Sequence, residues 1–255
     1  MKIAIVTGAS SGIGWEFARL IAAGPEPLDE LWLVARRRDR LEALRRELPV
    51  PARLFFLDLT RPEGPEVLKA ELKRLHPLVC LLVNAAGYGK FGRYDAVPEQ
   101  AALGMIDLNC RALTAVTTAA LPYLGRGARI LQMASTSSFQ PLPDMAVYAA
   151  TKAFVASYSR ALHEELRSRG VTCTAVCAGW MRTEFLEVAR RGADSGAVSR
   201  FPFLQTPRAV AEQALRDSAR GRAVSVCGLW NQLHRAAAKL LPAQAVMWGW
   251  KRIKD

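Results

Sequence analysis

The sequence has few histidines, few cysteines and no long apolar run. Its 255 residues include 3 histidines and 5 cysteines, and the apolar stretch at 78–83 is far shorter than the roughly 18 residues that a membrane-spanning helix needs. The first residues run directly into a glycine-rich turn, which leaves no room for a secretion signal. We therefore expect neither a transmembrane protein nor a secreted disulfide scaffold, and we predict a cytoplasmic location.

Residues that commonly bind metal ions are scattered along the chain. The histidines lie far apart, and the segment 163–167 fails the zinc-protease pattern because Arg167 stands where a second histidine is needed. The cysteines are an odd number spread over predicted strands and one helix, so we interpret them as core thiols. Cys173 and Cys177 share a strand face but have no further ligands nearby. The sequence predicts no metal site.

Acidic residues are too few to balance the basic ones. The chain has 35 Lys and Arg against 23 Asp and Glu, a formal net charge of +12. A phosphorylated cofactor, an acyl thioester, a nucleic acid and an acidic membrane would all suit such a surface. Nucleic-acid binding also calls for aromatic residues interleaved with basic ones on one face, and the sequence lacks that arrangement. We therefore predict no nucleic-acid partner.

Short apolar runs alternate with longer segments of helical period throughout the chain. This alternation predicts an α/β fold: a single doubly wound Rossmann-type domain over residues 1–255, with a seven-stranded, mostly parallel sheet. The predicted strands are 2–6, 30–35, 52–57, 78–84, 128–134, 171–177 and 223–226. The predicted helices are 12–23, 38–48, 63–75, 98–121, 145–169 and 207–220.

A glycine-rich turn at 7–14 joins the first predicted strand to the first predicted helix. Residues without a β-carbon let the backbone approach a pyrophosphate at the positive end of the helix dipole. The predicted cofactor contacts in this turn are Gly8, Ser10, Ser11, Gly12, Ile13 and Gly14.

The acidic residue that would bind the ribose of NAD, about 20 residues beyond such a turn, is missing. Arg36, Arg37 and Arg38 follow the second predicted strand instead. Charge-assisted hydrogen bonds to a 2′-phosphate predict that Arg36 and Arg37 select NADP(H) over NAD(H). The alternative is that these arginines belong to the solvated start of the next helix, and Arg38 is the strongest case for it.

Tyr148 and Lys152 lie four residues apart, which places a phenol beside an ammonium on one helix face. A free tyrosine has a pKa of about 10, and we expect the neighbouring cation to lower it toward the range useful for proton transfer. Ser135 ends the fifth predicted strand, from where its hydroxyl can reach the same carbonyl oxygen.

With these motifs the chain resembles the short-chain dehydrogenase/reductase family over essentially its whole length. The resemblance implies that Ser135 polarises the substrate oxygen, that Tyr148 transfers the proton, and that Asn109 holds a water in the proton relay. It also implies that Lys152 binds the nicotinamide ribose and lowers the pKa of Tyr148. The further cofactor contacts that it implies are Asp58, Leu59, Asn84, Ala85, Ala86, Gly87, Tyr148, Lys152, Gly179, Met181 and Thr183.

The sequence departs from the family pattern at two places. Ala85 replaces the second asparagine of the family's NNAG motif, and residues 177–180 lack the usual proline, which removes a fixed φ from that turn. Trp180 in the same turn either narrows the pocket or acts as an aromatic plug under a lid.

Two late segments complete the expected site. Residues 183–203, with Gly192 and Gly196, show little periodicity and predict a lid that closes over substrate. Apolar residues in it favour a hydrophobic ketone such as a 3-oxoacyl thioester, a lipid or a steroid-like ketone. Residues 229–255 are basic and amphipathic, with Trp248 and Trp250 beside lysine and arginine. This segment either contacts a membrane surface weakly or packs against the domain or a partner subunit.

The main hypothesis is therefore an NADP(H)-dependent oxidoreductase that interconverts a ketone and a secondary alcohol. One alternative is a non-catalytic NADP-binding sensor or scaffold, and another is an NAD-linked alcohol dehydrogenase. By resemblance we also expect a homodimer or homotetramer paired through the helices at 98–121 and 145–169.

Overall fold

The computed structural model describes residues 1–191 and 197–254. Seven parallel strands form one sheet in the order β3-β2-β1-β4-β5-β6-β7. The strands are β1 (Lys2–Thr7), β2 (Glu30–Ala35), β3 (Ala52–Phe56), β4 (Leu78–Asn84), β5 (Leu124–Met133), β6 (Thr172–Val176) and β7 (Val224–Ser225). The predicted doubly wound fold is confirmed. The strand order reverses between β1 and β4, where such sheets open a crevice for a ligand.

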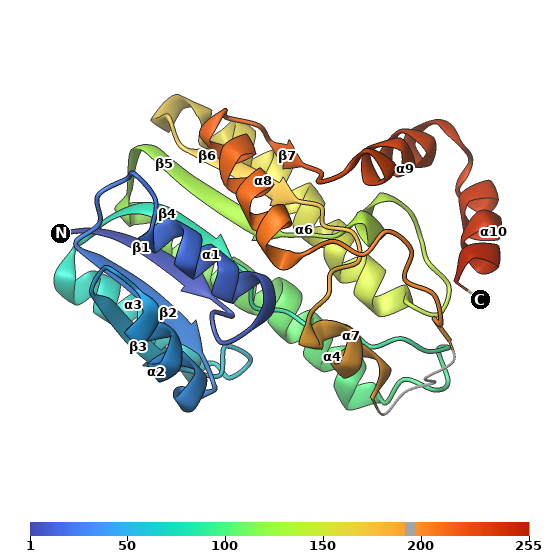
Figure 1. Ribbon diagram of the computed structural model, residues 1–255, viewed down its shortest axis with the longest axis horizontal. Coiled ribbons are helices and arrows are strands. Elements are labelled where there is room, and N and C mark those ends of the chain that lie inside the picture. Colours follow the sequence, from blue (N-terminus) through green and yellow to red (C-terminus); the bar gives the residue numbers. More distant parts are fainter. Residues whose placement is uncertain (192–196, 255) are drawn as a thin grey trace.

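Helices cover both faces of this sheet (Figure 1). The α-helices are α1 (Gly12–Ala22), α2 (Arg38–Glu47), α3 (Glu63–Leu75), α4 (Glu99–Ile106), α5 (Leu113–Ala120), α6 (Ala146–Glu165), α7 (Glu184–Arg190), α8 (Pro207–Ala219), α9 (Leu229–Leu240) and α10 (Ala243–Ile253). Short helical turns are η1 (Asp107–Ala112), η2 (Leu121–Tyr123), η3 (Thr136–Phe139) and η4 (Arg167–Arg169). In the described part of the chain, no helix is long and apolar enough to cross a membrane.

The two faces of the sheet follow from alternation along the strands. In β1, Ala4 and Val6 pack with α1, α2 and α8, whereas Ile3 and Ile5 pack with α3, α5 and α6 on the other side. Successive side chains of a strand point to opposite faces, and a strand that is covered on both faces must be apolar throughout. This burial fixes the positions of the carboxyl ends of the strands, where the glycine turn and Ser135 lie.

Three predicted segments differ from the structure. The helix predicted at 98–121 is divided into α4, the π-helix η1, α5 and the 3₁₀ turn η2, and the helix predicted at 145–169 ends at Glu165 before η4. β5 begins at Leu124, four residues before the predicted start, because it continues along the edge of β4. A π-helix inserts a residue into an α-helical run, and the hydrophobic period of the sequence does not reveal it.

The predicted lid is only partly without regular structure. α7 forms within it, where Phe91 N–H donates to Ala189 O at 3.0 Å and Lys90 Nζ donates to Val188 O at 2.6 Å. These bonds come from a distant loop, so they correct the expectation of an unstructured segment. Gly192 and Gly196 lie outside the described residues.

Candidate active site

A cavity of about 1280 Å³ lies at the carboxyl ends of the strands. It exceeds the range of roughly 300–1,000 Å³ that is usual for one small ligand, so a cofactor and a substrate fit together. The predicted site residues that line it are Gly8, Ser10, Ser11, Gly12, Ile13, Gly14, Arg36, Arg37, Asp58, Leu59, Ala85, Ala86, Gly87, Ser135, Tyr148, Lys152, Gly179, Met181 and Thr183. Asn84 and Asn109 lie behind its wall.

The glycine turn forms one end of the cavity. Gly8 has φ +69°, and a β-carbon there would lie 2.7 Å from Ala86 N, while one on Gly14 would overlap the carbonyl oxygen of Gly8. The first turn of α1 has no acidic residue, and Ser11 at its N-cap makes no side-chain cap. The free N–H groups of this turn therefore remain available to an anion, and the cofactor contacts expected here stay a prediction.

The arginines after β2 have different surroundings. Arg37 donates from Nε to Ser10 Oγ at 3.3 Å and from Nη1 to Glu184 Oε2 at 2.9 Å. Arg36 Nη1 lies 3.9 Å from Asp58 Oδ2. Arg38, in contrast, stacks over the Phe56 ring at 4.4 Å and does not line the cavity. The solvated-helix interpretation therefore fits Arg38, whereas Arg36 and Arg37 face the cavity.

Two charged residues at this end were not singled out by the sequence. Glu184, the first residue of α7, lies beside both Arg37 and Arg40, and Arg40 Nε donates to Ser10 O at 3.4 Å. Only the fold brings Glu184 near Arg37, because 147 positions separate them.

Asp58, which the sequence predicted as a cofactor contact, has a lowered pKa. Burial acts to raise the pKa of Asp58, but hydrogen bonds from Thr60 and the charge of Arg36 outweigh that effect.

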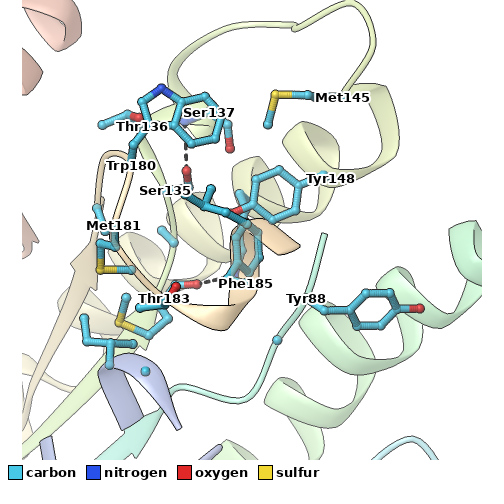
Figure 2. Close-up of a pocket in the computed structure, with 18 of the residues that line it drawn as sticks. Tyr88, Ser135, Thr136, Ser137, Met145, Tyr148, Trp180, Met181, Thr183 and Phe185 are labelled. Carbon is cyan, nitrogen blue, oxygen red and sulfur yellow. Dashed lines mark hydrogen bonds between the residues drawn. The ribbon is translucent and has the colours of Figure 1, made fainter. Parts of the chain in front are cut away.

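Ser135, Tyr148 and Lys152 meet in the middle of the cavity (Figure 2). Ser135 follows β5, and its hydroxyl accepts the Ser137 N–H at 3.1 Å and is hydrogen-bonded to Tyr148. Lys152 Nζ donates to Met133 O at 2.6 Å and lies 5.8 Å from the centre of the Tyr148 ring. Tyr148 and Lys152 are both buried on the inner face of α6. The predicted grouping of these three side chains is therefore present.

The pKa values in this group correct one expectation. Burial raises the pKa of Tyr148 to about 12 despite the hydrogen bond with Ser135, and burial lowers the pKa of Lys152 to about 8. Lys152 does not lower the pKa of Tyr148 here, because loss of water dominates both groups and the ammonium is directed to Met133 O. Tyr148 is therefore protonated throughout the neutral range.

The two asparagines support the cavity from behind. Asn84 Nδ2 donates to Thr117 Oγ1 at 2.9 Å and to Gln132 Oε1 at 3.0 Å, which ties β4 to α5 and β5. Asn109, in η1, donates to Tyr88 O and Thr151 Oγ1 and accepts the Tyr88 N–H at 3.1 Å. These bonds hold the chain after Gly87 against α6. The water-holding role expected of Asn109 stays a prediction.

Aromatic side chains form the wall opposite the glycine turn. The Tyr148 ring lies 5.5 Å from Phe185 of α7, and both rings are drawn with Trp180 among the residues that line the pocket in Figure 2. Trp180 lines the cavity and stacks with Trp250 of α10 at 6.4 Å. Trp180 therefore lies in the wall of the pocket, which it narrows, and its ring also packs against α10. Packing against the domain was one of the alternatives for the segment that contains Trp250, and this contact agrees with it, although the period of the helix did not indicate which residue it meets.

In residues 1–191 and 197–254, no group of three His, Cys, Asp or Glu residues lies together in a way that could hold a metal ion. Cys80, Cys173 and Cys177 are buried, and Cys110 and Cys227 are half-buried. Burial raises the pKa of Cys173 to about 12 and that of Cys80 and Cys177 to about 11. These three thiols stay protonated and act as small apolar core groups.

Comparisons with known proteins agree with this geometry. The sequence model for short chain dehydrogenase matches residues 2–194. Sulfoacetaldehyde reductase of Chromohalobacter salexigens is 36% identical over 82% of this chain and 84% of its own. Very-long-chain 3-oxoacyl-CoA reductase of Bos taurus is 30% identical over 73% of this chain and 62% of its own. A short-chain dehydrogenase from Sphingobium yanoikuyae, solved with NADPH, has a TM-score of 0.78 and 30% identity, covering 94% of this chain and 95% of that one.

Proposed function

Since this chain belongs to the short-chain dehydrogenase/reductase family, we propose that it is an NADP(H)-dependent oxidoreductase that interconverts a ketone and a secondary alcohol on a hydrophobic substrate. The observation that carries the proposal is the position of Tyr148 and Ser135. They lie between a glycine turn suited to a dinucleotide and a wall of aromatic and aliphatic side chains. Neither the glycine turn alone nor the apolar wall alone would favour this reaction over simple nucleotide binding.

The residues present fit a phosphorylated dinucleotide. The missing β-carbons of Gly8 and Gly14 let the backbone of the glycine turn pack closely against its neighbours at the start of α1, where a pyrophosphate would bind. Arg36 and Arg37 would hold the 2′-phosphate. Asp58 and Leu59 would border the adenine, while Lys152 and Thr183 would hold the nicotinamide half. When bound, the nicotinamide supplies or accepts the hydride.

The protein's own part in the reaction is to hold the carbonyl and to move a proton. Ser135 Oγ would donate a hydrogen bond to the substrate oxygen, and the Tyr148 hydroxyl would give that oxygen its proton. Because its pKa is raised, Tyr148 keeps its proton at neutral pH, and reduction needs this proton for the substrate oxygen. Oxidation would require Tyr148 to lose its proton first, so we expect the oxidative rate to increase toward alkaline pH.

The cavity supports a hydrophobic substrate. Beyond Tyr148 it is lined by Leu142, Met145, Trp180, Phe185, Leu186, Val246 and Trp250. Lys90 also lines it, but its ammonium donates to the carbonyls of Val188 and Arg191. The named relatives differ widely, since one reduces a small sulfonated aldehyde and another a very long acyl thioester. A ketone on an acyl thioester, a lipid or a steroid-like ring fits these walls best.

The first experiment follows NADPH absorbance with 3-oxoacyl thioesters, steroid ketones and simple aromatic ketones. We expect turnover of at least one hydrophobic class. We also expect Tyr148→Phe to lose about 10² to 10⁴ in rate while still binding NADPH, because it keeps the ring and lacks the proton. Tight NADPH binding with no turnover anywhere in the panel would favour the non-catalytic sensor.

A second experiment tests coenzyme choice. Arg36→Ala combined with Arg37→Ala should weaken NADPH binding about a hundredfold and leave NADH binding unchanged, because each lost charge-assisted bond costs about 1.5–3 kcal/mol. Arg38→Ala removes one positive charge from a side chain that stacks on Phe56, so it is the matched control for Arg36→Ala and Arg37→Ala measured as single variants. If the Arg36 and Arg37 changes affected the affinities for NADPH and NADH no differently from the Arg38 change, the NAD-linked alternative would be favoured.

Oligomerisation belongs to the same proposal. Ile106 of α4 and Phe154 of α6 are exposed apolar residues on the helices through which we expect subunits to pair. We propose a homodimer or homotetramer that uses these helices. Sedimentation velocity should show more than one subunit, and Phe154→Asp should reduce the mass. A monomeric wild-type chain would contradict this part of the proposal.

A further inference from the structure

The helices α9 and α10 (residues 229–253), joined by a short bend and called the hairpin below, bury few of their residues. Figure 1 shows both helices beyond the carboxyl ends of the strands, away from the sheet. Asn231 is the one buried residue of α9, and α10, which the structure describes in full, has none. Such a pair of short helices does not owe its amphipathic pattern to the protein core.

Large apolar side chains gather on this hairpin. Seven of the seventeen that are exposed in the described part of the chain belong to it, although it spans only residues 229–253. They are Leu229, Trp230, Leu233, Leu240, Leu241, Trp248 and Ile253. Leu240 is 83% exposed and Trp248 is 60% exposed. Soluble proteins rarely leave such a cluster in water unless it contacts something.

The charge of the hairpin indicates what it contacts. From residue 229 to residue 255 the sequence has five lysines and arginines and one acidic residue, the final Asp255. Lys254 pairs with Asp144 of the body at 3.4 Å, whereas Lys239, Lys251 and Arg252 are exposed. The Arg252 guanidinium lies 3.9 Å from the centre of the Trp248 ring. A tryptophan beside an excess of exposed cations suits a surface of negative headgroups over an apolar layer.

The hairpin is anchored at its two ends. At the start of α9, Asn231 Nδ2 donates to Cys227 O at 2.8 Å, in the space that Gly179 leaves by lacking a β-carbon. In α10, Trp250 Nε1 donates to Pro143 O at 3.0 Å. The bend between the helices, with Leu240 and Leu241, is held by neither anchor. The apolar bend is thus the part that is presented outward.

We propose that the α9–α10 hairpin docks this protein on the surface of an anionic phospholipid bilayer, with Leu240 and Trp248 entering the headgroup layer. The same hairpin borders the active-site cavity, because Trp230, Leu233, Leu241 and Ile253 both line that cavity and are exposed. Docking through the hairpin would therefore bring the bilayer close to the part of the cavity that these four residues line. An apolar substrate could enter there without crossing water, a consequence that rests on the proposed function.

The test measures how much protein sediments with vesicles. Mixed phosphatidylcholine and phosphatidylserine vesicles should bind the wild-type protein, and phosphatidylcholine alone or added salt should reduce binding. Leu240→Glu with Trp248→Glu should weaken binding at least about tenfold. Neither residue lines the cavity, so turnover of a water-soluble ketone should not change.

The matched control places the same two charges elsewhere. Val67→Glu with Leu78→Glu alters exposed apolar residues of α3 and β4, and this variant should bind vesicles like the wild type. Equal losses in both double variants would mean that net charge alone acts, and this would overturn the proposal. Wild-type protein that stays in the supernatant would overturn it as well.

A second copy of the chain is the competing occupant of the hairpin. Sedimentation velocity without vesicles distinguishes the two, because Leu240→Glu with Trp248→Glu should leave the mass unchanged if the hairpin docks on lipid. A fall in mass would assign the surface to subunit pairing instead. Vesicle binding needs no turnover, so it can succeed where the proposed reductase activity fails, and the reverse also holds.

Discussion

The glycine-turn end of the cavity and the hairpin end are built in opposite ways. At the glycine turn, backbone atoms of the loops that follow β1 and β4 lie so close that β-carbons on Gly8 and Gly14 would collide with them. At the hairpin, a β-carbon on Gly249 would meet nothing within 4 Å, and few side chains are buried. The first end permits almost no variation, whereas the second can change its residues without disturbing the fold.

This difference separates the end of the cavity proposed for cofactor binding and proton transfer from the end proposed for substrate selection. Cofactor binding and proton transfer depend on dry, closely packed elements in which a displacement is costly. Under the proposed function, many of the substrate contacts would lie on α9 and α10, and the side chains of these helices could vary with the substrate. Four experiments test whether the two ends of the cavity differ in this way.

The largest effect concerns Lys152, whose burial in the dry part lowers its pKa from 10.5 to about 8. Between these two pH values the unfolded chain holds the proton that the folded chain has lost, so the contribution of this lysine to stability increases with pH. The difference in unfolding free energy between wild type and Lys152→Met should therefore increase by about 3 kcal/mol from pH 7 to pH 10.5.

Urea unfolding at several pH values measures this difference. The buried cysteines and Tyr148 have raised pKa values and reduce stability above pH 9, but they do so in both proteins and cancel. A difference that is constant with pH would show that Lys152 is better solvated than its burial indicates.

The next effect compares two glycines inside helices. Gly14→Ala should lower the free energy of unfolding by about 2 kcal/mol and abolish NADPH binding, because the new methyl group overlaps the carbonyl oxygen of Gly8. Gly249→Ala, in open space within α10, should leave stability unchanged or slightly raised. Urea midpoints and NADPH titration measure both. Similar losses in the two variants would remove the contrast between the two ends.

Removing a hairpin anchor should act on substrate only. Trp250→Ala loses the hydrogen bond to Pro143 and the contact with Trp180, so KM for a hydrophobic ketone should increase about tenfold while NADPH affinity stays the same. Trp248→Ala on the same helix does not line the cavity and is the control. Steady-state kinetics with a soluble ketone measures both, and a change in NADPH affinity would show that the two ends are coupled.

The smallest effect is expected at Glu184, which pairs with Arg37 across the mouth of the glycine-turn end. An exposed ion pair is worth up to about 1 kcal/mol, so Glu184→Gln should tighten NADPH binding about threefold by freeing Arg37 for the 2′-phosphate. Glu187→Gln on the same helix, which removes a pairing with Arg191, should have no effect. Weaker NADPH binding in Glu184→Gln would mean that Glu184 positions Arg37 rather than competing for it.

Much of the site could be predicted because its motifs are short. The turn at 7–14, the pair Tyr148 and Lys152, and the arginines after β2 are each encoded within a few residues, and their spacing already places them on one turn or one helix face. The strands were predictable for a similar reason, since burial on both faces requires nearly continuous apolar runs.

The pKa values of the site residues and the contacts between distant segments, in contrast, depend on the tertiary structure. Burial in α6 sets the pKa values of Tyr148 and Lys152, the π-helix turns Asn109 inward, and the fold brings Glu184 to Arg37 and Trp250 to Trp180. Local spacing determines which side chains share an element, because helix and strand periods are fixed by the backbone. Solvent exclusion and long-range pairing arise only when distant elements pack together, so sequence order alone does not determine them.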